Sequence, residues 1–419
     1  MRQRVKIQSA KAPAGEPQPQ KTALLFGAGY TALALVPHLQ RTGYRVAVTS
    51  RDAKKRAALK AGGVEAFDFS PQTIQALLPV LKRADLVLSS AGPTAKAAGQ
   101  MGDPILDVIA AAASTPLNAL APNLKWAGYL SATSVYGDRG GKWAFEDEYL
   151  YPTTKRGRAR VEAELAWLET GWPVHVFRLA GIYGPKVGGG YGKGELLISR
   201  SPLDRIRAAG TARAVVKPGH LVNRIHLDDI IQAIMASIER PNPARVYNIA
   251  DGHPAPPQDV VRFAARLLGL PSPLVMSHDD DRLTPMARSF YTECKRVDIS
   301  RARRELGFDP AYTDYRLGLI RLAQAASPAQ MWLAGHLDVP SASLSKVMAL
   351  LPDHIAASRA EAGCVRFDAV QDRENPCRIH VTEVFQSVSA FDAHQARTHS
   401  SPWFDAARKC PRDYVVAGV

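Results

Sequence analysis

The chain has 419 residues, of which 46% are hydrophobic and 22% charged, values typical of a globular protein that buries a core. No apolar run approaches the roughly 20 residues of a membrane-spanning helix. Residues 1–20 lack the apolar stretch of a secretory signal, and the four cysteines are too scattered for a disulfide scaffold or a paired-cysteine metal site. We therefore expect a cytoplasmic protein with no membrane contact and no bound metal.

The charge balance bears on the partners of the protein. The 53 basic and 39 acidic residues give a net charge of +14 at pH 7. The basic residues are spread along predicted helices, without the basic stripe and interleaved aromatic residues that are typical of nucleic-acid binding. We expect no nucleic-acid partner, and we interpret the charge as attracting an anionic cofactor or small-molecule substrate.

Residues 1–20, rich in Pro, Gln and Lys, predict a flexible head. From residue 21 onward, short apolar runs alternate with helical patterns. Strands are predicted at 22–26, 44–49, 64–69, 84–90, 126–132 and 173–180, and helices at 31–41, 52–61, 72–82, 104–113 and 157–170. This alternation is typical of βαβ units and predicts an α/β fold with a doubly wound parallel sheet.

The pattern changes in the second half of the chain. Short extended pieces at 214–217 and 246–249, among helices near 195–209, 228–240, 257–269 and 314–326, predict a small substrate lobe, so that the first domain spans 21–325. Residues 326–330 are interpreted as a linker. Beyond them the predicted order is strand 331–338, helix 341–361, strands 365–370 and 378–385, helix 388–407 and strand 413–419. This β-α-β-β-α-β order predicts an α+β ferredoxin-like domain over 331–419.

A glycine motif follows the first predicted strand. Gly27, Gly29 and Ala32 form the pattern G-x-G-x-x-A, with Tyr30 and Thr31 between them, where a strand turns into a helix. The glycines permit a tight turn and a close approach of the backbone to a diphosphate, which the helix N-terminus attracts. The motif predicts a dinucleotide site in a Rossmann-type domain.

The residues at the end of the second predicted strand determine whether NAD or NADP binds. An acidic side chain there binds the ribose hydroxyls, whereas an arginine favours a 2′-phosphate. This chain has Ser50, Arg51 and Asp52 at that place. Arg51 with the Ser50 hydroxyl favours NADP as the cofactor, while Asp52 leaves NAD open.

Further motifs follow in a fixed order: Asp68-Phe69, SSAGP at 89–93, SATSVYG at 131–137, FRLAGIYGP at 177–185, NRIHLDDI at 223–230, VYNIADG at 246–252 and CKRVDISRARRELGFDPAY at 294–312. Taken together, residues 22–325 resemble the extended short-chain dehydrogenase/reductase superfamily, in its epimerase/dehydratase-like branch. The resemblance implies that Asp68 and Phe69 hold the adenine. It also implies that Ser90, Ala91 and Gly92 lie beside the cofactor.

The same resemblance implies catalysis by a tyrosine, with a lysine four residues later that lowers the pKa of the phenol and a Ser or Thr that orients the substrate. Tyr151 and Lys155 have this spacing, and Thr133 or Ser134 completes the set. On a helix this spacing brings both side chains to one face. However, Pro152 follows the tyrosine, so the pair is also compatible with straddling the start of a helix.

An alternative register places Arg156 and Arg160 at the tyrosine and lysine positions. Arginine does not donate a proton at neutral pH, so this register removes the usual acid. Such divergence is similar to that of atypical members that bind nucleotide with altered or lost reductase activity. The sequence leaves both registers open.

Other polar residues are expected on the substrate side. These are Arg178, Tyr183 and Arg224, of which Arg224 is suited to an anionic group. His226 is interpreted as a core histidine. A mobile loop over the site, or an exposed one, is predicted by five glycines, namely Gly188, Gly189, Gly190, Gly192 and Gly194.

Residues 331–419 carry the segments 359–385 and 391–404, which resemble the antibiotic-biosynthesis-monooxygenase-like (ABM) domain, a dimeric ferredoxin-like α/β barrel. The resemblance implies that His394 and His399 face the cleft between sheet and helices. Their separation of five residues lacks the one-turn spacing of a helical metal pair, so no metal is predicted there. A small sheet buries its open face by pairing with a second copy, so we expect homodimerisation through this module.

Two functions follow from these patterns. The first is an NAD(P)-dependent oxidoreductase or epimerase-type enzyme for a small metabolite, fused to a module with possible cofactor-independent monooxygenase activity. The second is a non-catalytic nucleotide-binding sensor or scaffold, dimerised by its C-terminal module. They differ in the register that the segment 151–160 adopts.

Overall fold

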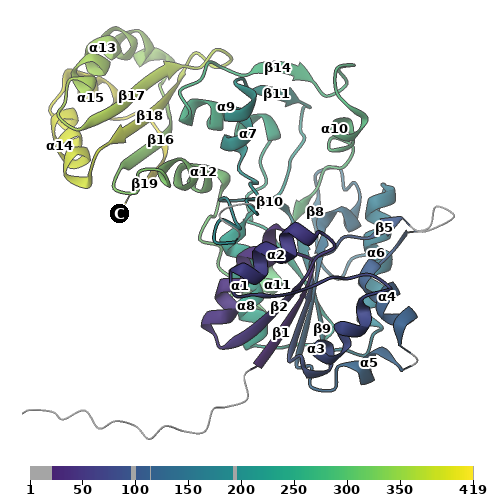
Figure 1. The fold of residues 1–419 in the computed structure, drawn as a ribbon. Helices are drawn as coiled ribbons and strands as arrows, with labels where there is room; N and C mark the ends of the chain where they lie inside the picture. The colour runs from purple at the N-terminus through teal and green to yellow at the C-terminus, as the bar shows by residue number, and fades with distance from the viewer. Residues whose placement is uncertain (1–20, 96–100, 114, 192–195, 419) are drawn as a thin grey trace, which may run out of the picture.

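The structure, a computed structural model, describes residues 21–95, 101–113, 115–191 and 196–418. The expected flexible head, 1–20, lies outside these ranges, as do Gly192 and Gly194 of the glycine-rich loop. Figure 1 shows three parts, namely a parallel sheet wrapped by helices, a second lobe above it, and a C-terminal domain with its own sheet beside that lobe. No helix in the described ranges has the length and apolar character needed to cross a membrane.

The N-terminal domain is built on a seven-stranded sheet in the order β13-β9-β7-β4-β1-β2-β3, and every pair of neighbours is parallel. The strands are β1 (Lys21–Phe26), β2 (Tyr44–Thr49), β3 (Glu65–Phe67), β4 (Leu86–Ser89), β7 (Trp126–Ala132), β9 (Val174–Leu179) and β13 (Arg245–Ile249). The chain winds outward from β1 to β3 and then returns to β4 on the other side of β1. The ends of β1 and β4 therefore form the switch point at which α/β sheets bind ligands.

Helices cover both faces of this sheet, as the continuous apolar strands predict. One face packs against α1 (Tyr30–Arg41), α2 (Ala53–Ala61), α8 (Leu227–Glu239) and α11 (Ser300–Leu306). The other packs against η1 (Ile74–Ala76), α3 (Leu78–Arg83), α4 (Pro104–Ala112) and α6 (Lys155–Leu168), with α5 (Leu117–Leu120) at its margin. The doubly wound α/β fold expected from the sequence is confirmed.

The second lobe is assembled from short elements. Its helices are α7 (Pro202–Ala209), α9 (Pro257–Leu267), α10 (Pro285–Ser289) and α12 (Tyr315–Gln324). Its strand pairs are β10 (Gly181–Tyr183) with β12 (Arg224–His226), and β11 (Arg213–Val216) with β14 (Leu274–Ser277). A third pair, β8 (Trp143–Ala144) with β15 (Arg296–Val297), lies between lobe and sheet domain. Apolar residues of α7, α9 and α12 form the core of this lobe.

The C-terminal domain has the predicted β-α-β-β-α-β order, with one difference. Its elements are β16 (Met331–Asp338), α13 (Ser341–Arg359), β17 (Cys364–Gln371), β18 (Arg378–Phe385), α14 (Val388–His399), α15 (Pro402–Ala407) and β19 (Arg412–Ala417). The sheet order is β17-β18-β16-β19, antiparallel throughout. The single helix predicted at 388–407 is wrong, because Ser401 accepts a hydrogen bond from the amide of Phe404 and Pro402 follows it, which starts a second helix.

The two faces of this small sheet have different neighbours. One face packs on the domain's own helices. From the other face Trp332, Ala334 and Val384 join the apolar core of the second lobe, next to α9 and α12. The open face that was expected to pair with a second copy is therefore covered in part by the same chain. Homodimerisation stays a prediction, and this face no longer supplies its physical reason.

Polar contacts hold the C-terminal domain on the lobe. Arg366 donates hydrogen bonds to the carbonyl oxygens of Arg266 and Leu267, at 2.7 and 2.9 Å, where α9 ends. Arg316 of α12 forms an ion pair of 2.7 Å with Asp413 of β19. A cation at the C-terminal end of a helix also interacts favourably with the helix dipole. The end of α9 is thus capped by a residue from another domain.

Candidate functional site

The turn between β1 and α1 lies at the switch point of the sheet. Gly27 has φ +98° and its amide donates to the Thr49 hydroxyl at 3.0 Å. The hydroxyl of Ser90, just after β4, donates to the carbonyls of Phe26 and Gly27 at 3.2 and 3.1 Å. A Cβ atom at Gly27 would lie 3.0 Å from the Ser90 oxygen. The turn therefore needs glycine both for its backbone angle and for the close approach of β4.

The N-terminus of α1 is left open at this turn. Its cap residue Gly29 makes no side-chain bond, and its first turn holds no acidic residue. Thr31 and Ala32 are buried in the domain. The Tyr30 hydroxyl donates to the carbonyl of Pro185 at 2.7 Å, so this buried side chain ties the turn to the second lobe. The free amides of a helix start are what an anionic diphosphate binds.

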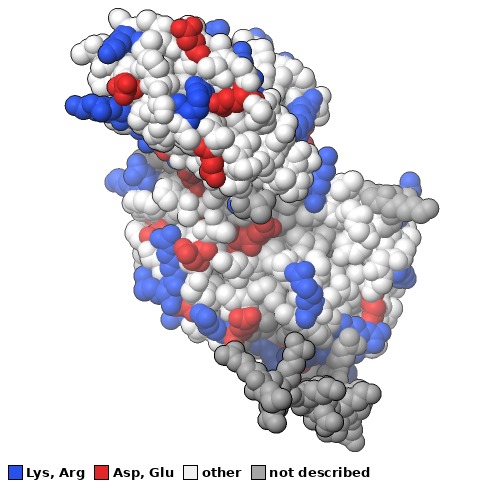
Figure 2. All heavy atoms as spheres, turned by 90° about the vertical axis from the view of Figure 1, so that its left-hand side faces the viewer, with Lys and Arg blue, Asp and Glu red and all other residues white. Residues whose placement is uncertain are grey.

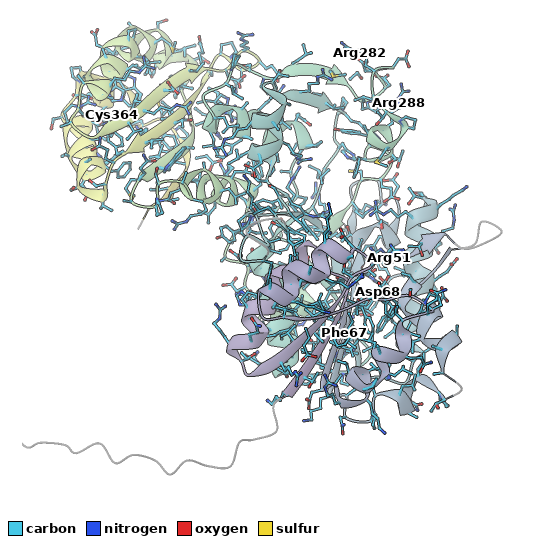
Figure 3. All side chains as sticks on the ribbon, in the orientation of Figure 1. Arg51, Phe67, Asp68, Arg282, Arg288 and Cys364 are labelled. Atoms are coloured by element: carbon cyan, nitrogen blue, oxygen red, sulfur yellow. The ribbon has the colours of Figure 1, made fainter. Side chains whose placement is uncertain are left out.

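The polar residues at the ends of β2 and β3 differ in whether they are free or are engaged by contacts within the fold. Arg51 is exposed and makes no hydrogen bond or ion pair within the described ranges, whereas Asp52 caps the first turn of α2. Asp68 pairs at 3.0 Å with Arg56, which also donates to the carbonyl of Ser50 at 2.8 Å. Figure 3 shows Arg51 and Asp68 at the end of the sheet nearest the second lobe. Arg56, which the sequence did not single out, connects the two strand ends.

The side chain of Phe69 belongs to the core of the domain. It is buried, and its ring meets Phe26 edge to face, with ring centroids 5.4 Å apart. Its side chain anchors the loop after β3 to the core, and only its backbone remains for a nucleotide.

An arginine from α6 contacts the loop that follows β4. The guanidinium of Arg160 donates to the carbonyl of Leu130 at 2.8 Å and to the Tyr129 hydroxyl at 3.1 Å. A Cβ atom at Gly92 would lie 3.0 Å from the same guanidinium. Arg160 therefore reaches from α6 to the loop after β4, where Ala91 and Gly92 were expected beside the cofactor. Arg156, one helical turn earlier, is exposed.

Tyr151 and Lys155 do not share a helical face. Helix α6 begins at Lys155, and Thr154 caps it by accepting a hydrogen bond from the amide of Gly157. Tyr151 precedes the helix, its side chain is 64% exposed, and its ring lies 5.9 Å from the guanidinium of Arg139. The pair straddles a helix start, and the one-turn proximity expected for a helical Tyr-x-x-x-Lys pair is absent.

Thr133 and Ser134 begin a short 3₁₀ helix, η3 (Thr133–Tyr136), directly after β7, and both are partly exposed. A Cβ atom at Gly157 would lie 2.7 Å from the Ser134 carbonyl oxygen, so α6 starts close against this turn. These two hydroxyl residues lie at the carboxyl edge of the sheet, as expected.

The structure places Arg178 in the interior and not on the substrate side. Its guanidinium pairs with Glu164 at 2.8 Å, and both side chains are almost fully buried. It also donates to the Tyr136 hydroxyl at 2.9 Å, and Glu164 accepts a further bond from Ser131. Because every strong donor of Arg178 is engaged within the fold, its role is to hold β9 against α6.

Arg224 and Tyr183 lie deep in the second lobe. Arg224 donates to the carbonyls of Val222 and Ala255, and its guanidinium lies 5.8 Å from the Tyr315 ring centroid. Tyr183 is buried and burial holds its pKa far above the usual value.

His226 is buried beside them, as a core histidine. His226 caps α8, because its Nδ1 accepts a hydrogen bond from the backbone amide of Asp228. Burial lowers the pKa of His226 to about 4. The nearby carboxyl of Asp251 has its pKa raised to about 7, mainly because it is buried. These groups are therefore neutral or half-ionised at neutral pH.

The C-terminal domain encloses a cavity of about 320 Å³ between its sheet and its helices. His394 and His399 both line it, together with aromatic residues that include Phe367, Trp403 and Tyr414. The His394 Nδ1 lies 2.7 Å from a carboxylate oxygen of Glu361. His399 is exposed and its Nδ1 contacts the backbone carbonyl of Gln395.

The sequence reasoning missed Glu383, the buried carboxyl of this cavity. It lies on β18 between the inward-facing residues Val381 and Phe385. A charged residue on the apolar face of a predicted strand was the available signal. Its Oε2 lies 3.6 Å from the Nε2 of His394 and has no hydrogen-bond partner.

Charged side chains on the surface are mixed in sign. On the face shown in Figure 2, lysines and arginines are interspersed with aspartates and glutamates over both the C-terminal domain and the sheet domain. Within the described ranges, His, Cys, Asp and Glu do not gather in groups of three that are suited to holding a metal ion.

Comparisons with known proteins agree with this architecture. The model of the NAD dependent epimerase/dehydratase family matches residues 23–250, and that of the antibiotic biosynthesis monooxygenase family matches 333–406. Protein YeeZ of Escherichia coli K12 is 33% identical over 189 residues, which are 44% of this chain and 58% of YeeZ. The match thus spans little more than half the length of this curated relative.

Solved structures extend the comparison over the first domain. A conserved protein of unknown function from Silicibacter pomeroyi DSS is 42% identical, with a TM-score of 0.63, over 73% of this chain and 99% of that one. MoeE5 in complex with UDP-glucose and NAD is 21% identical with a TM-score of 0.54, over 73% and 98%. The dTDP-glucose 4,6-dehydratase of Bacillus anthracis, in complex with NAD, is 17% identical with a TM-score of 0.55, over 73% and 96%. The last two show a shared fold.

Proposed function

Because the chain belongs to the NAD dependent epimerase/dehydratase family, we propose that it binds a nicotinamide dinucleotide between the ends of β1 and β4 and uses it in redox chemistry on a small metabolite. The observation that carries this proposal is the glycine turn at Gly27, followed by the uncapped start of α1. The bound nicotinamide supplies hydride transfer to or from a substrate carbon. The amides at the start of α1 bind the diphosphate, and the ends of β2 and β3 receive the adenosine.

NADP is the proposed nucleotide. Arg51 is exposed at the end of β2 and forms no ion pair with another described residue, so its guanidinium is available for a 2′-phosphate. Asp52, the residue that favours NAD in the sequence, has its carboxylate occupied by the cap of α2. Both points support NADP over NAD.

We further propose that Arg156 and Arg160, and not Tyr151 and Lys155, border the nicotinamide end of the crevice. The contact of Arg160 with the loop at Gly92 supports this register, as does the exposure of Tyr151. In this arrangement Arg156 attracts an anionic group on the substrate, and Thr133 or Ser134 is the hydroxyl nearest the carboxyl edge of the sheet. An arginine keeps its proton at neutral pH and does not act as the acid.

This register also favours a second candidate function, a nucleotide-binding sensor without turnover. Titration of the purified full chain with NADPH and NADH tests the binding step that both functions share. NADPH oxidation at 340 nm with aldehydes, ketones and quinones then separates them. Turnover that survives Tyr151→Phe and falls with Arg156→Ala supports the enzyme with the arginine register. Binding without turnover on this panel supports the sensor, and the absence of binding to either nucleotide contradicts both.

The C-terminal domain is proposed to hold a small molecule in its own cavity. The match to the antibiotic biosynthesis monooxygenase family supports this assignment, and oxygenation without a cofactor stays a prediction. Oxygen uptake in the presence of a quinol is the measurement that tests it. An uptake no faster than that of the quinol alone contradicts it.

A further inference from the structure

The cavity of the C-terminal domain contains a buried acid in apolar surroundings. Glu383 projects from β18 on the face that also carries Ile379 and Val381, which belong to the core under the helices. Glu383 is 6% exposed, and one of its carboxyl oxygens has no hydrogen-bond partner among the described residues. Leaving a buried polar atom unpaired is energetically unfavourable. Because Glu383 lines the cavity and its carboxyl is not satisfied by the protein, this carboxyl is suited to bonding a ligand.

A histidine with a fixed orientation faces this acid. The Nδ1 of His394 lies 2.7 Å from Glu361, which assigns the ring proton to Nδ1. Arg397 donates to the other oxygen of Glu361 at 2.5 Å and keeps that carboxylate in place. The remaining nitrogen, Nε2, lies 3.3 Å from the Thr398 hydroxyl and 3.6 Å from Glu383. Its lone pair is thus available to accept a proton inside the cavity.

The groups packed around the pair favour the neutral form of both. Burial and the nearby Glu361 raise the pKa of Glu383 and Arg397 lowers it, so that the net value is about 8. Burial also lowers the pKa of His394, although its bond to Glu361 acts in the other direction. His354, stacked on Trp403, has its pKa lowered to about 4 by burial and by Arg397. The cavity therefore offers a protonated acid next to an unprotonated base at neutral pH.

We propose that Glu383 and His394 form an acid–base pair that interconverts the keto and enol forms of a flat, neutral ketone bound in this cavity. His394 Nε2 takes a proton from the carbon next to the carbonyl, and the electrons of that C–H bond form the C=C bond. The carbonyl oxygen takes the proton of Glu383 and becomes the enol hydroxyl. A proton then passes from His394 to Glu383 and restores both groups. The reaction needs no oxidant and no cofactor.

The lining of the cavity defines the class of substrate. A volume of about 320 Å³ lies at the lower end of the range for ligand pockets and suits a molecule of one or two fused rings. The parallel rings of His354 and Trp403, with centroids 4.2 Å apart, form one aromatic wall, and Phe367 extends it. Trp403 lines the cavity, and its indole nitrogen has no hydrogen-bond partner in the part of the chain that the structure describes, so it is a second candidate donor for a ligand oxygen. These features fit a bicyclic aromatic ketone.

The experiment uses the full chain and the ketone 2-tetralone in D₂O under argon, with proton NMR to follow the loss of the hydrogens next to the carbonyl. We expect the wild-type protein to accelerate exchange by about 100-fold or more over buffer, the scale of general acid–base catalysis. Glu383→Gln and His394→Gln should each reduce this acceleration at least tenfold. His336→Gln is the matched control, because this histidine lies on the same sheet but contacts Asp338 and does not line the cavity.

Folding and positioning are checked separately. Far-UV circular dichroism and thermal melting show whether each variant is folded, and added imidazole should restore part of the exchange to His394→Ala. Glu361→Gln should shift the pH profile of exchange, because Glu361 orients His394 and does not touch the ketone. Exchange at the buffer rate with wild-type protein overturns the proposal. Exchange that is unchanged in folded Glu383→Gln or His394→Gln overturns it as well. None of these measurements depends on NADPH binding.

Discussion

Buried charges explain much of what individual residues do in this protein. The ion pair between Glu164 and Arg178 ties α6 to β9 directly under the carboxyl edge of the sheet. Removing one partner of a buried pair leaves the other charge without compensation, which costs about 3–5 kcal/mol. The sequence suggested Arg178 for substrate binding because the motif around it resembles the start of a substrate lobe, but the inward-facing pattern of β9 buries it.

Glu164→Gln is therefore expected to lower the free energy of unfolding by about 3 kcal/mol or more. Urea denaturation measures this value. The double variant Glu164→Gln/Arg178→Met should recover part of the loss, because it removes the unpaired guanidinium. A single variant as stable as the wild type would contradict the assignment of this pair to the core.

The second prediction about a single residue concerns Arg51. Arg51→Ala should weaken NADPH binding about tenfold, since a charge-assisted bond to a 2′-phosphate is worth about 1.5–3 kcal/mol. NADH binding should not change. Isothermal titration measures both affinities. Lys60→Ala, a basic residue at the other end of α2, is the control, and equal losses for the two nucleotides would refute the role of Arg51.

Glu383 makes the stability of the protein depend on pH. In the folded state it keeps its proton up to about pH 8, whereas the unfolded chain loses this proton near the ordinary glutamate value. Its contribution to stability is therefore present at low pH and is lost as the pH rises from the ordinary value toward 8.

Glu383→Gln does not ionise, so its stability relative to the wild type should increase between pH 5 and pH 9, on the order of a few kcal/mol. Urea denaturation at both pH values measures the difference. Glu162→Gln, which removes an exposed carboxylate on α6, should show no such trend. A difference between Glu383→Gln and the wild type that is the same at both pH values would show that Glu383 is ionised in the folded protein.

At the scale of elements, the turns and caps decide where function is possible. Gly27 and Gly43 both have left-handed backbone angles, but a Cβ atom at Gly27 meets Ser90, whereas one at Gly43 meets nothing within 4 Å. Both Gly→Ala variants should lose about 1 kcal/mol of stability from backbone strain. Only Gly27→Ala should also lose nucleotide affinity, which fluorescence titration measures. Equal affinity in both variants would contradict the role of the turn between β1 and α1.

The observed bounds of helices and strands show where a prediction from the period of apolar residues alone succeeds and where it fails. Six strands of the parallel sheet are apolar enough to be predicted, and their positions agree with the structure to within about two residues. The seventh, β13, was expected in the second lobe but pairs with β9 at the edge of the sheet. The helix expected at 388–407 fails because a serine cap and a proline interrupt an otherwise helical pattern. Tyr151 was open to a place inside a helix, but the cap at Thr154 starts α6 after it.

At the scale of the whole molecule, the C-terminal domain is docked on the second lobe through an apolar face and a few polar contacts. Arg366→Ala removes the donors to the end of α9, so we expect the link between the domains to loosen. Limited proteolysis near 325–330 should become faster than in the wild type. Arg359→Ala is the control, because Arg359 contacts Asp368 of its own domain. Equal cleavage of Arg366→Ala and the wild type would show that the apolar face alone holds the domains.

The parts of the site that the sequence could predict are local in the chain. The glycine turn, the strand before it and the helix after it form one continuous stretch from Lys21 to Arg41, and the backbone conformation of each follows from its own side chains. The parts that it missed are pairs of residues that lie on different elements. Arg56 with Asp68, Arg160 with Gly92, and Glu383 with His394 meet only because strands and helices are packed in one particular order.

The sequence by itself determined the alternation of strands and helices, the nucleotide turn and the change to a second kind of domain after residue 330. These depend on short-range backbone preference and on the period of apolar residues. The tertiary structure decided that Arg160 meets the loop at Gly92, that Arg178 is an internal support, that the small sheet lies on the second lobe, and that Glu383 faces His394. Burial and contact between distant segments control these outcomes, and neither is visible in the local order of residues.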